Sequence, residues 1–222
     1  MSQSSLARAP RETPASAGTY AFRFKLFPLG LITGMFDVDL LKEAIREGCE
    51  NGYKLLRREF TLETRRVLFF LGALGFGLMF RKDEAAPENE YDWRVTLYKT
   101  RFFTRTVDLE ALTRTLNEAA SGGFELHFAI KYPTRFLFFF PRESYVFVFR
   151  KPFADAGVQY RYSVAQTPYR FFTRTLDASA YEADLNRQGG QGGLFKVSFR
   201  DERRVFGMFR QPTAVTVFEH QE

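Results

Sequence analysis

The residues on which most enzyme and metal sites depend are scarce in this sequence. It has one cysteine, two histidines and one tryptophan among 222 residues. The lone Cys49 cannot form an internal disulfide, which favours a reducing, cytoplasmic compartment. Neither His127 nor His220 has a companion at ligand spacing, and no CxxC or HxxxH motif occurs. We therefore expect no bound metal, no cofactor and no catalytic site.

Apolar runs long enough for a membrane-spanning helix are also absent. The longest apolar stretch, residues 67–80, is shorter than the roughly 20 residues that such a helix requires, and it contains three glycines. Basic residues flank it on both sides, so it predicts a hairpin of two apolar strands closed by a glycine turn. Residues 1–18 are rich in Ser, Ala, Pro and Arg and contain no apolar run typical of a signal peptide. We expect them to form a flexible or partner-bound tail.

An internal repeat is the most informative feature of the sequence. The motif RFFTRT occurs at residues 101–106 and again at 170–175. A more diverged copy at residues 30–53 aligns without gaps to residues 101–124. With 27 Phe, 10 Tyr and 45% hydrophobic residues, the chain has enough apolar material for a substantial core. We therefore expect a globular protein built from three tandem modules.

The alignment places one helix in each module. Each expected helix is preceded by an aspartate that can accept a backbone N–H of the first turn, namely Asp37, Asp108 and Asp177. Apolar residues follow four and eight positions later, which is the spacing of a buried stripe. These residues are Leu41 and Ile45, Leu112 and Leu116, and Tyr181 and Leu185. Glycines at residues 52, 123, 192 and 193 mark the helix ends.

Strand patterns surround each expected helix, one before it and two after it. The sequence therefore predicts an α+β fold of three β-α-β-β modules, each an antiparallel sheet covered by one helix. Modules of this size are marginal alone, so we expect them to pack together with pseudo-threefold repetition around an approximate axis. The expected boundaries are module 1 at 19–83, an acidic linker at 84–91, module 2 at 92–152, a linker at 153–157 and module 3 at 158–222.

The middle module resembles a known family. Its residues LNEAASGGFEL and the later YVFVFRKP resemble the small bacterial domain-of-unknown-function 4177 family, which has a helix reading L-N-x-x-x-x-x-G-(W or F)-E-L. The matching residues are Leu116, Asn117, Gly123, Phe124, Glu125 and Leu126. The match is weaker in the third module, and in the first Arg46 replaces the asparagine. The resemblance implies a compact α+β fold and brings no catalytic residue with it.

The combination of arginines and aromatic residues is the main indication of function. The formal net charge is +6, and arginines stand beside aromatic residues in several segments. Protein interfaces favour both residue types, and a membrane surface would attract the same combination. We therefore expect a non-catalytic accessory subunit that docks on a larger protein assembly, with the cytoplasmic surface of a membrane complex as one setting. The candidate contact residues are Arg65, Arg66, Phe69, Phe70, Phe76, Phe80, Arg81, Lys82, Arg105 and Arg174.

Two other functions are alternatives. Arginines and aromatics on strand faces can also bind nucleic acid, through phosphate contacts and base stacking, with Arg105 and Arg174 as the recurring candidates. An enzyme would have to use carboxylates such as Asp108 and Glu125, one of them with a raised pKa in a pocket. The glycine clusters at residues 72–77 and 188–193 lack the Lys-Ser/Thr pair of a phosphate-binding loop. No small-molecule substrate is therefore expected.

Overall fold

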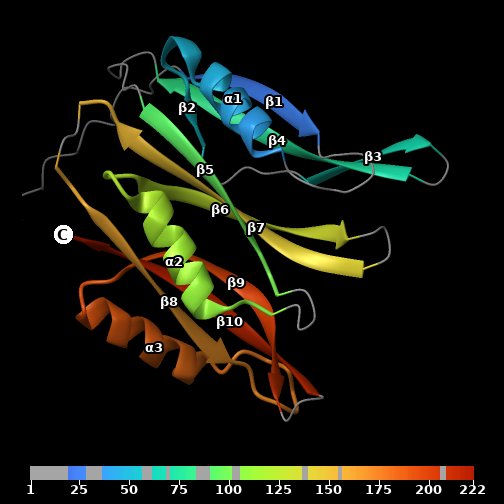
Figure 1. Cartoon of the computed structure of the whole chain (residues 1–222), viewed down its shortest axis with the longest axis vertical. Helices are drawn as coiled ribbons and strands as arrows, with labels where there is room; N and C mark the ends of the chain where they lie inside the picture. The colour runs from blue at the N-terminus through green and yellow to red at the C-terminus, as the bar shows by residue number, and fades with distance from the viewer. Residues whose placement is uncertain are drawn as a thin grey trace, which may run out of the picture.

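The computed structural model describes residues 20–28, 37–56, 62–68, 71–83, 91–101, 106–136, 140–154, 157–205 and 209–222. The predicted tail at residues 1–18 lies outside them. Within the described residues the chain forms three helices and three antiparallel sheets (Figure 1). The α+β class and the threefold repetition of a β-α-β-β module are therefore confirmed.

The last strand of each module lies in the middle of its sheet. In module 1, β4 (Leu71–Asp83) lies between β1 (Tyr20–Pro28) and the two strands β2 (Lys54–Leu55) and β3 (Leu62–Leu68). In module 2, β7 (Phe140–Pro152) lies between β5 (Tyr91–Lys99) and β6 (Glu125–Phe136). In module 3, β10 (Phe209–Gln221) lies between β8 (Tyr160–Pro168) and β9 (Leu194–Val205).

The three helices begin as the sequence predicts. They are α1 (Val38–Gly48), α2 (Leu109–Ala120) and α3 (Ala178–Gly190). Each is capped by the aspartate before it: Asp37 accepts from the N–H groups of Asp39 and Leu40, Asp108 from that of Ala111, and Asp177 from that of Ala180. These bonds satisfy backbone donors that a helix start leaves unpaired.

The modules follow one another in a row (Figure 1). Helix α1 packs on its own sheet and also on β5 of module 2, and α2 packs on its own sheet and on β8 of module 3. One apolar core therefore joins Leu41 and Ile45 to Trp93 and Val148, and a second joins Leu116 to Val215. Among the described residues neither core joins module 1 to module 3. The sheet of module 2 is thus covered on both of its faces.

The predicted glycine turn is wrong, although the hairpin itself is present. Strands β3 and β4 are antiparallel, and Leu68 at the end of β3 is opposite Leu71 at the start of β4. The three glycines lie inside β4, with Gly72 opposite Arg66 and Gly75 opposite Glu63. A pattern of apolar residues can predict that strands exist. A run of successive apolar residues does not show where the chain turns from one strand to the next.

Candidate functional site

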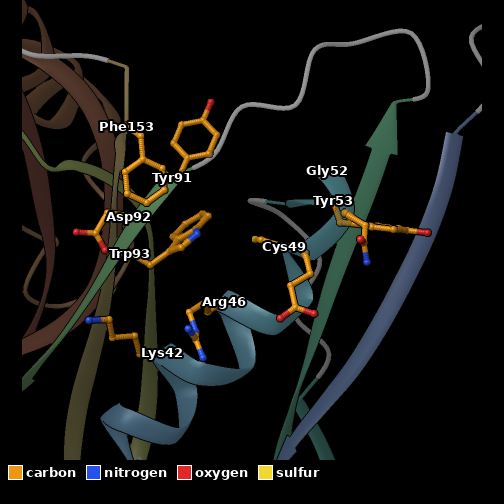
Figure 2. A pocket seen from close by; sticks show the side chains of 11 residues that line it. Lys42, Arg46, Cys49, Gly52, Tyr53, Tyr91, Asp92, Trp93 and Phe153 are labelled. Carbon is orange, nitrogen blue, oxygen red and sulfur yellow. The ribbon is translucent and has the colours of Figure 1, made fainter.

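A cavity of about 410 Å³ lies where the end of α1 meets β5 (Figure 2). Its wall carries Lys42 and Arg46 from α1, Tyr53 after the short 3-10 helix η1 (Glu50–Gly52), and Asp92 and Trp93 from β5. Phe153 covers one side, and Cys49 also lines the wall. The cavity has charged residues of both signs, but no histidine among its lining residues.

Cys49 is the thiol that lines this cavity. Burial raises the pKa of the Cys49 thiol to about 11, although a backbone hydrogen bond at Leu55 and the charge of Arg23 act in the opposite direction. The thiol therefore stays protonated at neutral pH and is a poor nucleophile. Cys49 is half-buried and packs beside the first core.

The two carboxylates of the enzyme alternative lie outside this cavity, and neither has a raised pKa. A hydrogen bond from Arg101 and one from the Ala111 N–H lower the pKa of Asp108, which is a helix cap. Burial alone would raise the pKa of Glu125, but Lys196 and Arg150 bind this carboxylate and lower it. Both groups are ionised acceptors in ion pairs, an arrangement that holds structure together and has no acid to donate.

His127 connects module 2 to module 1. Its Nε2 lies 3.0 Å from the carbonyl oxygen of Leu55, and its ring and that of Trp93 form a T-shaped pair with centroids 5.5 Å apart. His127 stands at a register shift between β6 and β7, so it projects differently from its neighbours. This histidine therefore has a structural role between the two modules. His220 lies 2.9 Å from the Ser163 hydroxyl, inside module 3.

Modules 2 and 3 are joined by a buried charge network that the sequence analysis missed. Lys196 donates to Glu125 and to Glu219, both at 2.7 Å. The Tyr162 hydroxyl donates to Glu219 at 2.6 Å and accepts from the N–H of Leu126 at 2.6 Å. Lys196 occupies the register shift of β9, as His127 does in β6. His127 and Lys196 also occupy the same position in the aligned modules, and both contact the preceding module. This correspondence is the sequence feature that could have pointed to the contact.

Asn117 forms a second connection between modules 2 and 3, and its role could not be predicted from the sequence. Its side-chain amide donates to the Tyr162 carbonyl at 3.1 Å, and its Oδ1 accepts the Tyr162 N–H at 2.7 Å. One side chain on α2 thereby satisfies both backbone groups of a residue on β8. Arg46 stands at this position in α1, where it pairs with Glu43. Asn186 has the position in α3, where it is exposed.

Asp201 is a buried carboxylate with one unsatisfied oxygen. Its Oδ2 accepts the Val107 N–H at 2.8 Å, while Oδ1 has no hydrogen-bond partner among the described residues. Burial raises the pKa of Asp201, partly offset by its backbone hydrogen bonds. The ionised form therefore costs stability at neutral pH, and this cost disappears as the pH falls through the raised pKa.

We expect Asp201→Asn to raise the free energy of unfolding at pH 7 by about 1 kcal/mol, because the amide keeps an acceptor for Val107 and carries no charge. The difference between variant and parent should shrink as the pH falls. Urea unfolding at several pH values measures it, with Glu202→Gln as the surface control. A difference that stays constant with pH, or a less stable variant at pH 7, would contradict the role of the buried charge.

The outer face of the first sheet is apolar, and none of the described helices covers it. We call it the open sheet face and define it by Tyr20, Phe22 and Phe24 on β1, Lys54 on β2, and Met79 and Arg81 on β4. Phe22 and Arg81 are opposite each other in register, as are Phe24 and Met79. The side chain of Phe22 is 61% exposed, and Tyr20 and Phe24 are also exposed. Arg81 lies over the Tyr20 ring at 4.9 Å from its centroid.

The corresponding faces of the other two sheets are buried. Trp93 and Tyr162 follow Phe22 at the offsets that relate the three capping aspartates, and they pair with Arg150 and Glu219 as Phe22 pairs with Arg81. Trp93 is 5% exposed and Tyr162 is 1% exposed. Because the preceding helix covers these two faces, the exposure of Phe22 follows from its place in the first module.

A second group of exposed aromatic residues lies at one end of module 3. Phe171 contacts Phe172 and Phe209, with ring centroids 5.4 and 6.1 Å apart. Phe172 is 95% exposed. We call these three residues the aromatic end. Arginines 170, 174 and 210 surround it and pair with Asp177 or Glu202.

The ten predicted contact residues differ in where they lie and in how much of each the structure describes. Phe69, Phe70 and Arg105 lie outside the described residues, and only the backbone is described for Arg65, Arg66 and Phe76. Arg81 is exposed and Lys82 half-buried, and Arg174 pairs with Glu202 at 3.4 Å. Phe80 is 0% exposed and belongs to the first core, so its predicted place on a docking surface is wrong.

Part of the RFFTRT repeat has a structural explanation. The N–H of Arg101 bonds the Thr106 carbonyl, and the N–H of Arg170 bonds that of Thr175. The Arg101 side chain pairs with the cap Asp108, and Arg170 pairs with the cap Asp177 at 3.3 Å. The first arginine of the motif thus closes the same loop and holds the same helix cap in both modules.

Comparisons with known proteins add no relative. No family model, curated protein or solved structure matches the chain. The resemblance of module 2 to the domain-of-unknown-function 4177 family therefore stays a prediction. In the part of the chain that the structure describes, no cluster of three or more His, Cys, Asp or Glu residues could hold a metal ion. None of the described helices is both long and apolar enough to cross a membrane.

Proposed function

We propose that the protein is a non-catalytic accessory subunit that docks on a larger protein assembly through the open sheet face. The observation that carries this proposal is the contrast between Phe22 and its two buried counterparts, Trp93 and Tyr162. Contiguous exposed apolar patches are uncommon on monomeric proteins and mark interaction sites. Three aromatic side chains with an arginine beside them also match the composition of interface cores.

The aromatic end supports a setting at a membrane surface, as the cytoplasmic face of a membrane complex would provide. Phenylalanines as exposed as Phe172 gain free energy when they enter the boundary between headgroups and acyl chains. Arg170, Arg174 and Arg210 would then lie at the level of anionic headgroups. The proposal therefore has two parts: the protein docks on a larger assembly, and this assembly lies at a membrane surface.

Nucleic-acid binding has less support among the described residues. Several of the arginines that could contact phosphates form hydrogen bonds within the protein. Arg23 donates to the carbonyls of Glu47 and Gly48, and Arg94 donates to those of Ala119 and Ser121. Backbone-bound arginines are helix caps, and they are poorly placed to neutralise a series of phosphates.

Affinity capture of the tagged full chain from its native cell tests the proposal. Soluble and mild-detergent membrane fractions should be analysed separately, each with and without nuclease. We expect a defined set of proteins that survives nuclease and falls by about tenfold with Phe22→Ser plus Phe24→Ser, since truncated aromatic anchors cost an interface more than 1 kcal/mol.

Leu40→Ser is the matched control, because Leu40 is an equally exposed apolar residue on α1, away from the open sheet face. Partners that are retained by the double variant, or lost equally in Leu40→Ser, would overturn docking through this face. Capture that disappears with nuclease would instead favour the nucleic-acid alternative.

A further inference from the structure

The open sheet face has two counterparts within the same chain, and both are covered by an α-helix. We propose that it binds an amphipathic α-helix of a partner protein, with two Leu or Ile residues four positions apart and a carboxylate that reaches Arg81 and Lys54. This inference rests on the proposed docking function and names the kind of segment that docks.

The internal interfaces show what these faces accept. On module 2, Leu41 and Ile45 of α1 share one core with Trp93, Val146 and Val148. On module 3, Leu112 and Leu116 of α2 share the other core with Tyr162, Val215 and Val217. In both cases the shared core contains an i, i+4 aliphatic pair of the covering helix, an aromatic residue of the first strand and aliphatic residues of the central strand.

The open sheet face keeps the apolar character that such a helix requires. Phe22 takes the place of Trp93 and Tyr162, and Phe24 that of Val95 and Val164. Met79 takes the place of Val148 and Val217 in the central strand. A sheet face that ended the row against water would be expected to carry polar residues here, as terminal repeats usually do.

The charged residues of the open sheet face indicate which charge the docked helix should carry. In module 2, Arg150 is opposite Glu125 and pairs with it at 3.2 Å. In module 1, Arg81 is opposite Lys54, so two cations stand where module 2 has an ion pair. Arg81 contacts the Tyr20 ring, and no ion pair of Arg81 or Lys54 is formed within the described residues. A carboxylate on the docked helix would compensate both charges.

A helix from a second copy of the chain is a poorer occupant. Helices α1 and α2 are already covered by a sheet on two sides. Helix α3 has no buried residue, and Glu182, Asn186 and Arg187 are exposed on it. Among the described helices none therefore has a free aliphatic stripe. The row ends in a polar helix at module 3 and in an apolar sheet at module 1.

A helical peptide with the sequence of residues 108–121 is the probe, because this segment already covers a sheet of the same kind. A side-chain cross-link on its polar side is needed, since isolated helices of this length are marginal in water. Fluorescence anisotropy should show saturable binding to the full chain, about tenfold weaker with Phe22→Ser plus Phe24→Ser or with Arg81→Glu. Hydrogen exchange should show protection of β1 and β4.

Two controls make the result specific. Leu40→Ser should bind the peptide like the parent, and a peptide with aspartates in place of Leu112 and Leu116 should not bind. Equal affinity of the parent and the open-face variants, or protection of β8 without β1, would overturn the inference. The peptide assay does not depend on any cellular partner, so its failure is separable from failure of the docking function.

A photo-crosslinking residue in place of Phe22, introduced into the full chain in its native cell, identifies the natural occupant. We expect crosslinks to a helical segment with an i, i+4 aliphatic pair and a carboxylate within one turn of it. Crosslinks to a strand, a loop or a second copy of the chain would overturn the helix and leave docking intact. Absence of any protein crosslink would overturn docking as well.

Discussion

Lys196→Met is expected to lower the free energy of unfolding by about 3–5 kcal/mol, because removing one member of a buried ion pair leaves the other charge uncompensated. The side chain of Glu219 is 1% exposed, and among the described residues it would lose its cationic partner and keep the Tyr162 hydroxyl. Glu125 would keep Arg150. Urea unfolding followed by circular dichroism measures the loss.

Arg187→Met is the control for the loss of a cation. Arg187 pairs with Asp184 on the surface of α3, and exposed pairs of this kind contribute about 0.5 kcal/mol or less. A loss for Lys196→Met no larger than that of the control would show that Glu219 finds water or another donor. The double variant Lys196→Met, Glu219→Gln should recover part of the stability, because the uncompensated charge is then gone.

Features that depend only on neighbouring residues along the chain could be predicted from the sequence. The aspartate caps need only a carboxylate next to the first helical residue, so an alignment of Asp37, Asp108 and Asp177 was sufficient. The strand patterns were sufficient for the β-α-β-β order for the same reason. The turn of the first hairpin was mispredicted, because many apolar residues in succession give no local signal for the reversal.

Contacts between modules could not be predicted in this way. His127 and Lys196 share a register shift, but one binds a backbone carbonyl and the other two carboxylates. Sequence alignment shows that the positions correspond and does not show which face of the sheet meets the preceding module. The same gap explains why Phe22, the most informative residue of the open sheet face, was absent from the predicted contact residues.

Phe22 and Phe80 show that strand register, and not residue type, decides whether a side chain lies in the core or on the surface. Both are phenylalanines in paired strands of one sheet, and Phe80 was the one predicted to contact a partner. Phe80 pairs with Arg23, and Phe22 pairs with Arg81. Because side chains alternate across a strand, this shift of one residue points Phe80 toward α1 and Phe22 away from it. Only the pairing register distinguishes a core residue from a docking residue here.

Phe80→Ala should therefore destabilise the protein by about 3–5 kcal/mol, the usual cost of emptying a buried aromatic site. Phe22→Ala should change stability by about 0.5 kcal/mol or less, because its ring is mostly in water. Urea unfolding of both variants compares the two faces directly. Equal losses would mean that the open sheet face is covered within the isolated chain, and the docking proposal would fail.

The contact between Phe80 and α1 gives a sharper form of the same test. A Cβ on Gly48 would lie 2.0 Å from the Phe80 ring, so Gly48→Ala should cost the parent about 1–3 kcal/mol through overpacking. In the Phe80→Ala background the added methyl group enters the space that the ring has left, and the same substitution should cost little or add stability. A double-mutant cycle measures this coupling. Additive losses would place the Phe80 ring away from α1 and would restore it to the candidate docking residues.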